Sequence, residues 1–508
     1  MSDEAGLRVV LCWHMHQPQY CDLISGEYKL PWSYLHATKD YVDMAAHLEA
    51  VPGARAVVNF APVLLEQIDD YAAQVRGYLH EHKALRDPLL AALVEPVLPA
   101  HPERRLELIN NCLRVNRERV IDRFPAYQRL VKLVEPFRDN LSDLIYISDQ
   151  FLSDLVFWYH LGWIGETVRR NDLRMQRWQE QGSNFALHDR RELLVLIGDL
   201  LAGVIDRYAR LAEAGRVELS VSPYAHPIIP LMLDMQSARE AMPDVQLPEL
   251  EFYQGGEERA RWHIREGLNI FERYFGCKPL GCWPAEGSVS AATLELLGEY
   301  GFRWAATGET VLHNSLAAAP GGAAGAAPDA LFKGYRLSDT GPVCFFRDDN
   351  LSDEIGFTYS GWHADDAVAN FIHHLENIAT SHGRRGLAVA IVLDGENAWE
   401  YYPRNGCFFL TSLYKRLADH PRLHLTTFSE ALSGQRAATQ SLRGMVAGSW
   451  VYGTFSTWIG DPDKNRAWEM LVEAKHAYDR VMEKGRLDDK VKAECVLQLA
   501  RCEGSDWF

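Results

Sequence analysis

Short runs of apolar residues recur along the chain, and segments with apolar residues at helical spacing separate several of them. Apolar runs of this length, bounded by turn-forming residues, are typical of buried strands. We predict strands at residues 8–13, 55–60, 216–222, 279–285, 302–307, 342–347, 387–394 and 423–428. The segment 191–215 is the clearest helix, because its apolar residues repeat at helical spacing and it closes on Gly215. Strands that alternate with helices indicate a parallel sheet, either open or closed into a barrel.

The same pattern divides the chain into regions. Residues 64–215 hold only helical signals, so we predict a large helical insertion between the second and third strands. Residues 311–330 are rich in Ala, Gly and Pro, which is typical of a flexible loop. After about residue 435 the chain again shows helical patterns. We therefore expect a main domain at 1–435, which contains the insertion and the loop, followed by a C-terminal helical region at 436–508.

Charge and composition exclude several kinds of partner. A net charge of −17 repels nucleic acid phosphates and anionic membrane surfaces, so we expect neither as a partner. The N-terminal segment "MSDEAGLRVVLCW" lacks the basic and long apolar stretches of a signal peptide. The sequence has no run of about 18 apolar residues to span a membrane. The nine cysteines form no CxxC pair, which favours reduced thiols. We therefore expect a cytoplasmic protein.

Two histidines lie at the end of the first predicted strand, in "CWHMHQPQY" (12–20). Successive side chains of a strand alternate between its faces, so His14 and His16 share one face. Such a pair can hold a metal ion, bind a polar ligand by hydrogen bonds, or lie in the core with its hydrogen bonds satisfied. The third strand shows a similar pattern, because Glu218 and Ser220 share a face and His226 follows between prolines.

Carboxylates follow two further strands. Glu286 comes after Trp283 in "GCWPAEGSVS", and Asp394 ends an apolar run shortly before Glu396 and Trp399. Taken alone, an Asp after a strand is often a helix N-cap, and Glu286 can be a solvated loop residue. In a parallel barrel, however, catalytic groups gather at the carboxyl ends of the strands. Two carboxylates beside aromatic side chains are what glycoside hydrolysis needs: one attacks the anomeric carbon, and the other protonates the leaving oxygen and later activates water.

These strand ends form part of an ordered set of motifs. The set consists of "HMHQPQY", "VELSVSPYAHPIIPL", "CWPAEGSVS", "FRDDNLSDEIGF", "LDGENAWEYYPRNG" and "WIGDPDKNRAWEML". It resembles glycoside hydrolase family 57, in its α-amylase and amylopullulanase-like branch, from about residue 8 onward. The resemblance implies an α/β protein with an incomplete (β/α)7 barrel, a large helical insertion and a C-terminal helical region. It also implies α-glucan substrates and a retaining mechanism.

The resemblance also implies roles for individual residues. Glu286 matches the family's nucleophile and Asp394 its acid/base, with the C-terminal helical region completing the cleft. Asp394 and Glu396 are two residues apart and share a face of an extended strand end, so the sequence alone does not rank them as acid. We choose Asp394 because it ends the apolar run and because the resemblance points to it. The predicted substrate-binding residues are His14, His16, Gln17, Glu218, His226, Trp283, Glu396, Trp399, Trp458, Asp506 and Trp507.

The predicted function is hydrolysis of α-glucans of the α-amylase or amylopullulanase type, through a covalent glycosyl-enzyme; α-1,4 linkages are expected, and the sequence leaves the cleavage of α-1,6 linkages open. A 4-α-glucanotransferase or a glucan branching enzyme of the same family is an alternative, because transfer shares that intermediate. Alternatives of another class are a metal-dependent deacetylase or mannosidase-like hydrolase and a non-catalytic carbohydrate-binding protein. A metal site needs about three protein ligands, whereas the acids of "WPAEG" and "LDGEN" fit a nucleophile and an acid better. We therefore expect no metal and no cofactor.

Overall fold

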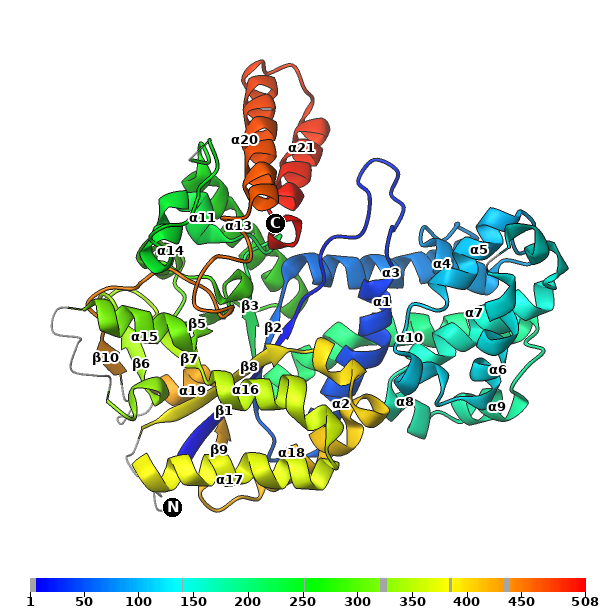
Figure 1. Cartoon of the computed structure of the whole chain (residues 1–508), viewed down its shortest axis with the longest axis horizontal. Coiled ribbons are helices and arrows are strands. Elements are labelled where there is room, and N and C mark those ends of the chain that lie inside the picture. Colours follow the sequence, from blue (N-terminus) through cyan, green and yellow to red (C-terminus); the bar gives the residue numbers. More distant parts are fainter. Residues whose placement is uncertain (1–5, 139, 251, 320–326, 383–385, 434–438) are drawn as a thin grey trace.

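The structure is a computed structural model that describes residues 6–138, 140–250, 252–319, 327–382, 386–433 and 439–508. Seven parallel strands pair in sequence, and the last pairs with the first, so that they form a closed barrel (Figure 1). The strands are β1 (Leu7–Met15), β2 (Ala56–Phe60), β3 (Val217–Val221), β4 (Gly281–Cys282), β5 (Trp304–Gly308), β7 (Val343–Arg347) and β8 (Ala388–Asp394). The predicted fold class, a (β/α)7-type barrel with helical regions, is confirmed.

Three further strands extend the sheet outside the ring. β9 (Leu423–Thr426) pairs with β1, and β6 (Gly334–Arg336) and β10 (Thr439–Ser441) continue outward from β7. Each of the eight predicted strands is present. The sequence prediction missed β6 and β10, because strands of three residues are too short to show an alternating pattern.

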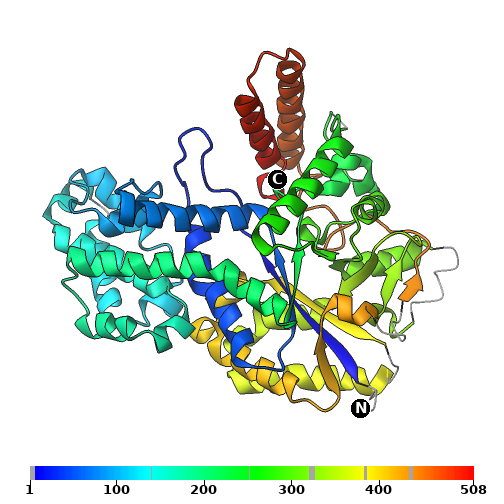
Figure 2. The ribbon, with the colours of Figure 1, turned by 180° about the vertical axis from the view of Figure 1, so that it is seen from behind.

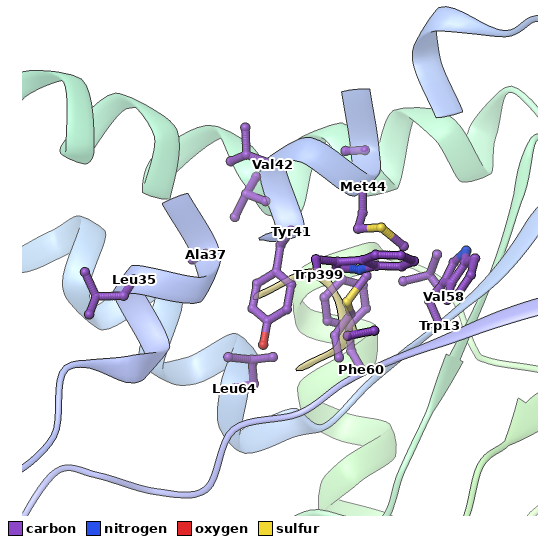
Figure 3. Packing of buried hydrophobic residues seen from close by; sticks show 14 of the residues in the cluster. Trp13, Leu35, Ala37, Tyr41, Val42, Met44, Val58, Phe60, Leu64 and Trp399 are labelled. Carbon is purple, nitrogen blue, oxygen red and sulfur yellow. The ribbon is translucent and has the colours of Figure 1, made fainter. Parts of the chain in front are cut away.

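Side chains alternate between the interior and the exterior of the barrel. On β1, Val10 and Cys12 point into the barrel interior, whereas Leu11 and Trp13 join the large core between the barrel and its helices. A strand buried on both faces has no polar face, which explains the continuous apolar runs in the sequence. Figure 3 shows this outer core, where Trp13 lies near Trp399, Val58 and Phe60.

Helices cover the barrel. Those that follow the strands of the ring are α1 (Trp32–His36), α2 (Val42–Ala50), α11 (Ile229–Leu233), α12 (Ala238–Ala241), α13 (Gly256–Phe275), α14 (Ala291–Glu299), α15 (Glu309–Ala318), α16 (Asp349–Asp353), α17 (Ala364–His382) and α18 (Cys407–Ala418). A further helix, α19 (Phe428–Ser433), follows β9. Among the residues that the structure describes, no helix combines the length and the apolar character needed to cross a bilayer.

A helical region projects from one side of the barrel, between β2 and β3. Two long helices, α3 (Pro62–Glu81) and α10 (Leu187–Glu213), pack together and connect it to the barrel (Figures 1 and 2). Between them lie α4 (Pro88–Val94), α5 (Pro102–Asn111), α6 (Pro125–Val134), α7 (Asp149–Trp163), α8 (Glu166–Asn171) and α9 (Leu173–Gln181). This region corresponds to the segment in which the sequence shows only helical signals.

Two predicted segments differ from the structure. The segment 311–330 is helical as far as residue 318, because α15 continues through it, and residues 320–326 lie outside the described residues. The segment after residue 441 is irregular as far as residue 461, and only then do α20 (Pro462–Glu483) and α21 (Asp489–Cys502) form a hairpin. The irregular segment contains several glycines and aromatic residues, "GMVAGSWVYGTFSTWIG", which the helical interpretation overlooked.

Glu218 lies inside the barrel and not at its carboxyl end. Its carboxylate accepts hydrogen bonds from Trp304 Nε1 (2.6 Å), Ser429 N (2.9 Å) and Ser429 Oγ (2.5 Å). Ser429 belongs to α19, whose Phe428 packs against Trp304 and Phe345 in the barrel interior. The structure therefore does not bring Glu218 to the substrate-binding position expected from the sequence. Glu218 fixes α19 to the barrel instead.

We predict that Glu218→Ala lowers the free energy of unfolding by about 1–3 kcal/mol, because it leaves buried donors without an acceptor. Chemical denaturation measured by fluorescence tests this. The Glu218→Gln control keeps a side-chain oxygen as acceptor and should lose clearly less stability. Turnover per folded molecule should stay unchanged in both variants. A loss of turnover without a loss of stability would restore Glu218 to a role in substrate binding.

Candidate active site

Four polar residues lie side by side at the carboxyl ends of adjacent strands. His14 of β1 is in register with Asp394 of β8 on one side and with Asn59 of β2 on the other. Asn59 is in turn in register with Ser220 of β3, and its amide donates to Ser220 Oγ (3.1 Å). We call these four residues the polar layer. It ends the apolar interior of the barrel, and two of its members, His14 and Asp394, line a cleft.

Glu286 reaches the same cleft from a helical turn that follows the very short β4. Its backbone is left-handed (φ 54°, ψ 27°), a conformation that residues other than glycine rarely adopt. Such a residue costs about 1–3 kcal/mol and persists only where its surroundings hold it. Here the Glu286 carbonyl accepts from Trp450 N (3.2 Å), and Gly287, the next residue, accepts from Thr307 Oγ1 (2.5 Å). Strain of this kind concentrates at functional sites.

Glu286, Asp394 and Asn397 lie between two cavities, and all three line both of them. The first cavity, about 510 Å³, is also lined by His14, His16, Gln17, Tyr20, Trp32, His36, Arg114, Trp163, Glu396, Glu400 and Asp506. The second cavity, about 550 Å³, is also lined by Thr310, Arg347, Asp349, Asp353, Phe357, Tyr401, Trp450 and Tyr452. A ligand that occupies both cavities must pass the two carboxylates.

The two carboxyls share a water-poor site. Burial, followed by the nearby Asp394, raises the pKa of Glu286 to about 7, against the opposing effect of the Trp450 Nε1–H bond (3.0 Å). Burial also raises the pKa of Asp394, although Asn397 Nδ2 donates to its Oδ2 (2.7 Å). Ionising both groups would place two like charges close together in a medium of low polarity. Each carboxyl therefore ionises more readily while the other is protonated.

Glu396 lies beneath the cleft. It is 1% exposed, and its Oε1 accepts from Gln17 Nε2 (3.1 Å) and from His16 N (3.3 Å). Burial and the neighbouring Asp394 raise the pKa of Glu396 well above its usual value, which favours its neutral form. Glu396 lines the first cavity only, whereas Asp394 borders both. Asp394 is thus better placed than Glu396 to reach a bond that lies between the cavities.

A chain of hydrogen bonds fixes the protons on two histidines. Burial lowers the pKa of His14 to about 3 and that of His226 well below its usual value, so both rings are neutral. His14 Nδ1 donates to Asn59 Oδ1 (2.7 Å), which leaves a lone pair on His14 Nε2. His226 Nε2 lies 3.1 Å from His14 Nε2 and must therefore donate a hydrogen bond to it. His226 Nδ1 then accepts a hydrogen bond from Ser505 Oγ (2.9 Å). The assignment follows from the orientation of the Asn59 amide, whose NH2 faces Ser220.

His16 is the member of the histidine cluster whose protonated form is favoured. Its ring stacks on His226 with centroids 3.9 Å apart, and its Nε2 lies 3.4 Å from Asp506 Oδ2. Burial opposes the charge, but Asp506, Glu286 and Asp394 together raise the pKa of His16. A positive His16 beside the carboxyl pair stabilises whichever of the two carboxyls is ionised.

His14, His16 and His226 each bring a ring nitrogen within 4.8 Å of the others, which meets a simple distance criterion for a metal site. A metal ion, however, binds an imidazole nitrogen along the plane of the ring. The rings of His16 and His226 are nearly parallel (22°) and stacked, so one ion cannot lie in both planes. The ring nitrogens of these histidines are better suited to bind sugar hydroxyls, which both donate and accept hydrogen bonds. The expectation of no catalytic metal stays a prediction.

The chain near residue 503 is held firmly against the site. Glu503 is fully buried and accepts hydrogen bonds from Arg259 (2.7 and 2.8 Å), His263 Nε2 (2.7 Å) and Tyr253 (2.5 Å). Against the cost of burial, these donors lower the pKa of Glu503 to about 2. This ion pair anchors the turn that follows α21 and so brings Ser505 to His226.

Two of the tryptophans predicted to bind substrate belong to the core. Trp283 is fully buried, and it packs below His14 (ring centroids 6.3 Å) and against Trp450 (5.1 Å). Trp399 is also buried, beside Trp13 (5.7 Å) in the outer core seen in Figure 3. Neither lines the two cavities, so any effect of these residues on a ligand passes through the residues they support.

Two other predicted tryptophans also lie outside the cavities. Trp458 is buried in a separate apolar cluster, where its carbonyl accepts from Trp468 Nε1 (2.9 Å). Trp507 is 65% exposed and donates to the Arg501 carbonyl (2.6 Å). The sequence does not show whether a Trp after a strand or in a loop points into a cleft, since this depends on tertiary packing.

The sequence prediction missed several residues that do line the cleft, most of them aromatic. Trp450 and Tyr452 come from the irregular segment that was expected to be helical. Trp32 lies at the start of α1, and Arg114 and Trp163 come from the helical insertion. Clustered glycines and aromatics around Trp450 were an available signal of a loop. No local pattern indicated the other three.

The fold and the site define a parallel-barrel protein with paired carboxylates in a cleft at the carboxyl ends of its strands. The family model for glycosyl hydrolase family 57 matches residues 10–445, and the chain belongs to this family. Comparison with curated proteins gives no match.

Solved structures with the same fold include three enzymes. A branching enzyme from Thermococcus kodakaraensis is 15% identical, with 99% of this chain and 85% of that chain covered and a TM-score of 0.60. An α-amylase from Thermotoga maritima is 14% identical, with 99% and 87% covered and a TM-score of 0.56. A 4-α-glucanotransferase from Thermococcus litoralis is 13% identical, with 98% and 55% covered and a TM-score of 0.52. At these identities the likeness concerns the fold alone.

We predict that Glu286→Gln gains stability relative to the wild type as the pH rises. The pKa of Glu286 is about 7 in the folded protein and 4.5 as its ordinary value. The stability linked to its proton is therefore complete below about pH 4.5 and is lost as the pH rises to about 7. The variant has no such proton to lose. Melting temperatures measured from pH 4 to 8 should show a difference that grows across this interval and is then constant. A difference independent of pH would contradict the burial of this carboxyl.

Proposed function

We propose that this protein is a retaining enzyme that acts on α-glucans through a covalent glycosyl-enzyme, with Glu286 as nucleophile and Asp394 as acid/base. The observation that carries the proposal is the position of the two carboxyls, which lie together between two cavities. A glucan that passes through the cleft presents one glycosidic bond to both groups at once. The histidine cluster and Asn397 supply hydrogen-bonding partners for its hydroxyls on one side.

In the first step the Glu286 carboxylate attacks the anomeric carbon, and the bond from that carbon to the glycosidic oxygen breaks. Asp394 donates its proton to the leaving oxygen. In the second step the Asp394 carboxylate takes a proton from water or from a sugar hydroxyl, whose oxygen displaces Glu286 from the anomeric carbon. The configuration at that carbon is inverted twice and is therefore retained.

Two hydrogen bonds at the site are compatible with this division of roles. The first step needs one proton on the pair, held by Asp394, with Glu286 ionised. Trp450 Nε1–H donates to Glu286, and a protonated His16 lowers the pKa of Glu286 as well. Burial is the largest effect on both carboxyls and raises both pKa values, so the proton is assigned to Asp394 by its proposed role as the acid. In the second step Asp394 is a carboxylate, and the hydrogen bond from Asn397 then stabilises it.

Hydrolysis of the α-amylase or amylopullulanase type is the activity we propose first. A 4-α-glucanotransferase or branching activity fits equally well, because cavities on both sides of the carboxyls leave room for an acceptor sugar as well as for the donor. Enzymes named for each of these activities share the fold. Product analysis on maltooligosaccharides, amylose and pullulan, by chromatography with NMR of the anomers, separates these activities and their linkage preference. Absence of any turnover would leave a carbohydrate-binding role.

We expect Glu286→Gln to fold normally, to bind maltooligosaccharides and to lose activity by several orders of magnitude. The change removes the group that forms the covalent intermediate, which is worth at least about 4 kcal/mol of transition-state stabilisation. A mechanism-based fluoroglycoside should label the wild type at Glu286 and leave the variant unlabelled, as read by peptide mass spectrometry. A label on another carboxylate would move the nucleophile there.

Asp394→Asn should impair substrates with poor leaving groups most, because it removes the proton donor. A substrate with an activated aryl leaving group needs no such proton and should still form the glycosyl-enzyme. Added azide should then restore turnover and give a glycosyl azide of retained configuration, measured by NMR. Glu396→Gln is the matched control, since it replaces a carboxyl two residues away whose neutral form burial already favours. If Glu396→Gln gives the azide response instead, Glu396 is the acid.

A further inference from the structure

A third cavity of about 590 Å³ lies near the second one, where α8, α17 and α18 meet. We call it the outer groove. Its walls include Arg170, Tyr359, Trp362, Phe408, Ser412 and Lys415. None of these residues lines the catalytic cleft, and the proposed chemistry uses none of them.

The outer groove combines a rigid aromatic floor with exposed aromatic rings. Tyr359 and Phe409 are buried and pack together (ring centroids 6.0 Å). Trp362 packs edge-on against Tyr359 (5.5 Å) and is 44% exposed, and Phe408 is 51% exposed. The Arg170 guanidinium lies 5.0 Å from the centre of the Phe408 ring. Large rings that are held in place and yet face the solvent are suited to stacking on a ligand.

Polar groups surround these rings. Ser412 Oγ donates to Asp365 Oδ1 (3.0 Å), and the side chains of His363 and Lys415 also line the groove. A sugar ring has an apolar face of C–H groups and a rim of hydroxyls that donate and accept hydrogen bonds. Aromatic faces with a rim of mixed donors and acceptors match both features. A purely apolar ligand would displace water from these polar and charged groups without replacing its hydrogen bonds.

The outer groove and the second cavity lie on either side of one wall. Phe357 and Tyr401 line the second cavity, whereas Tyr359 and Tyr402, which follow them closely in sequence, line the outer groove. The Tyr402 hydroxyl donates to the Ile355 carbonyl (2.6 Å), which ties the two segments of this wall together. Phe357 and Tyr401 are both exposed at its rim. A chain that leaves the second cavity therefore meets aromatic side chains along the way to the outer groove.

We infer that the outer groove is a second binding site for α-glucan, which holds a distant part of the same polymer whose scissile bond lies between Glu286 and Asp394. The inference rests on the proposed function, because the proposed substrate defines the ligand. Two linked binding sites raise the effective concentration of a long ligand at each of them. Short oligosaccharides cannot occupy both, so the outer groove selects for polymeric substrates.

The test compares long and short substrates in a Trp362→Ala/Phe408→Ala double variant. Both side chains are partly exposed, so the fold should tolerate their removal. We expect the KM for amylose to rise about three- to tenfold with kcat unchanged, whereas both parameters for maltopentaose stay the same. Introduced into the Glu286→Gln background, which does not digest the polymer, the double change should reduce retardation in a glycogen-containing native gel. Phe252→Ala, which removes an exposed ring outside these cavities, is the matched control.

An unchanged KM for amylose with unchanged gel retardation would overturn the outer groove as a glucan site. A double variant that loses maltopentaose turnover as strongly as amylose turnover would also overturn it, because the effect would then arise in the cleft or in folding. Wild-type turnover of maltopentaose tests the proposed function separately, since that substrate needs only the cleft. If the wild type turns over no glucan but its gel retardation depends on Trp362 and Phe408, the proposed function fails while the binding site stands.

Discussion

The register of the closed barrel is the constraint on which the site depends. Each strand of the ring is paired on both sides, so a slip of one residue in any strand would exchange its inner and outer faces. The pairing of β1 with β8 and β2 puts His14 beside Asp394 and Asn59. Buried polar groups are tolerated only where they bond to one another. Within the polar layer His14 bonds to Asn59 and Asn59 bonds to Ser220, and a change of register between these strands would break both bonds.

Glu286 does not belong to the polar layer, and its position depends on other means. It lies in a strained turn after the shortest strand of the ring, and Trp450 from the irregular segment bonds both its backbone and its carboxylate. The histidine cluster likewise depends on Ser505, which the buried Glu503 ion pairs bring into place. A strand of the barrel thus positions Asp394 directly. Glu286, in contrast, is positioned by contacts between parts of the chain that lie far apart in sequence.

The sequence predicted the strands of the parallel sheet well, because strands buried on both faces produce apolar runs that need no tertiary information. The closure of that sheet into a barrel was implied by the family resemblance and not by the runs themselves. The sequence also predicted that His14, Glu286 and Asp394 follow strands, which brings them to one end of the barrel. It failed where the answer depended on which way a side chain faces after its strand ends. Glu218 shares a face with Ser220, as expected, but it lies two residues deeper and bonds to α19. Trp399 and Trp450 both follow glycine-containing turns, yet only Trp450 lines the cleft.

The first cavity joins two parts of the molecule with different tasks. The groups proposed for bond cleavage come from the barrel, whereas Arg114 and Trp163 on the far wall come from the helical insertion. Strands of a closed ring accept few substitutions, because each change disturbs two neighbours. Helices that project to one side of the barrel are free of that restriction. Mutation and selection in such a lineage can therefore reshape the far wall, and with it the range of sugars accepted, while the reaction centre stays as it is.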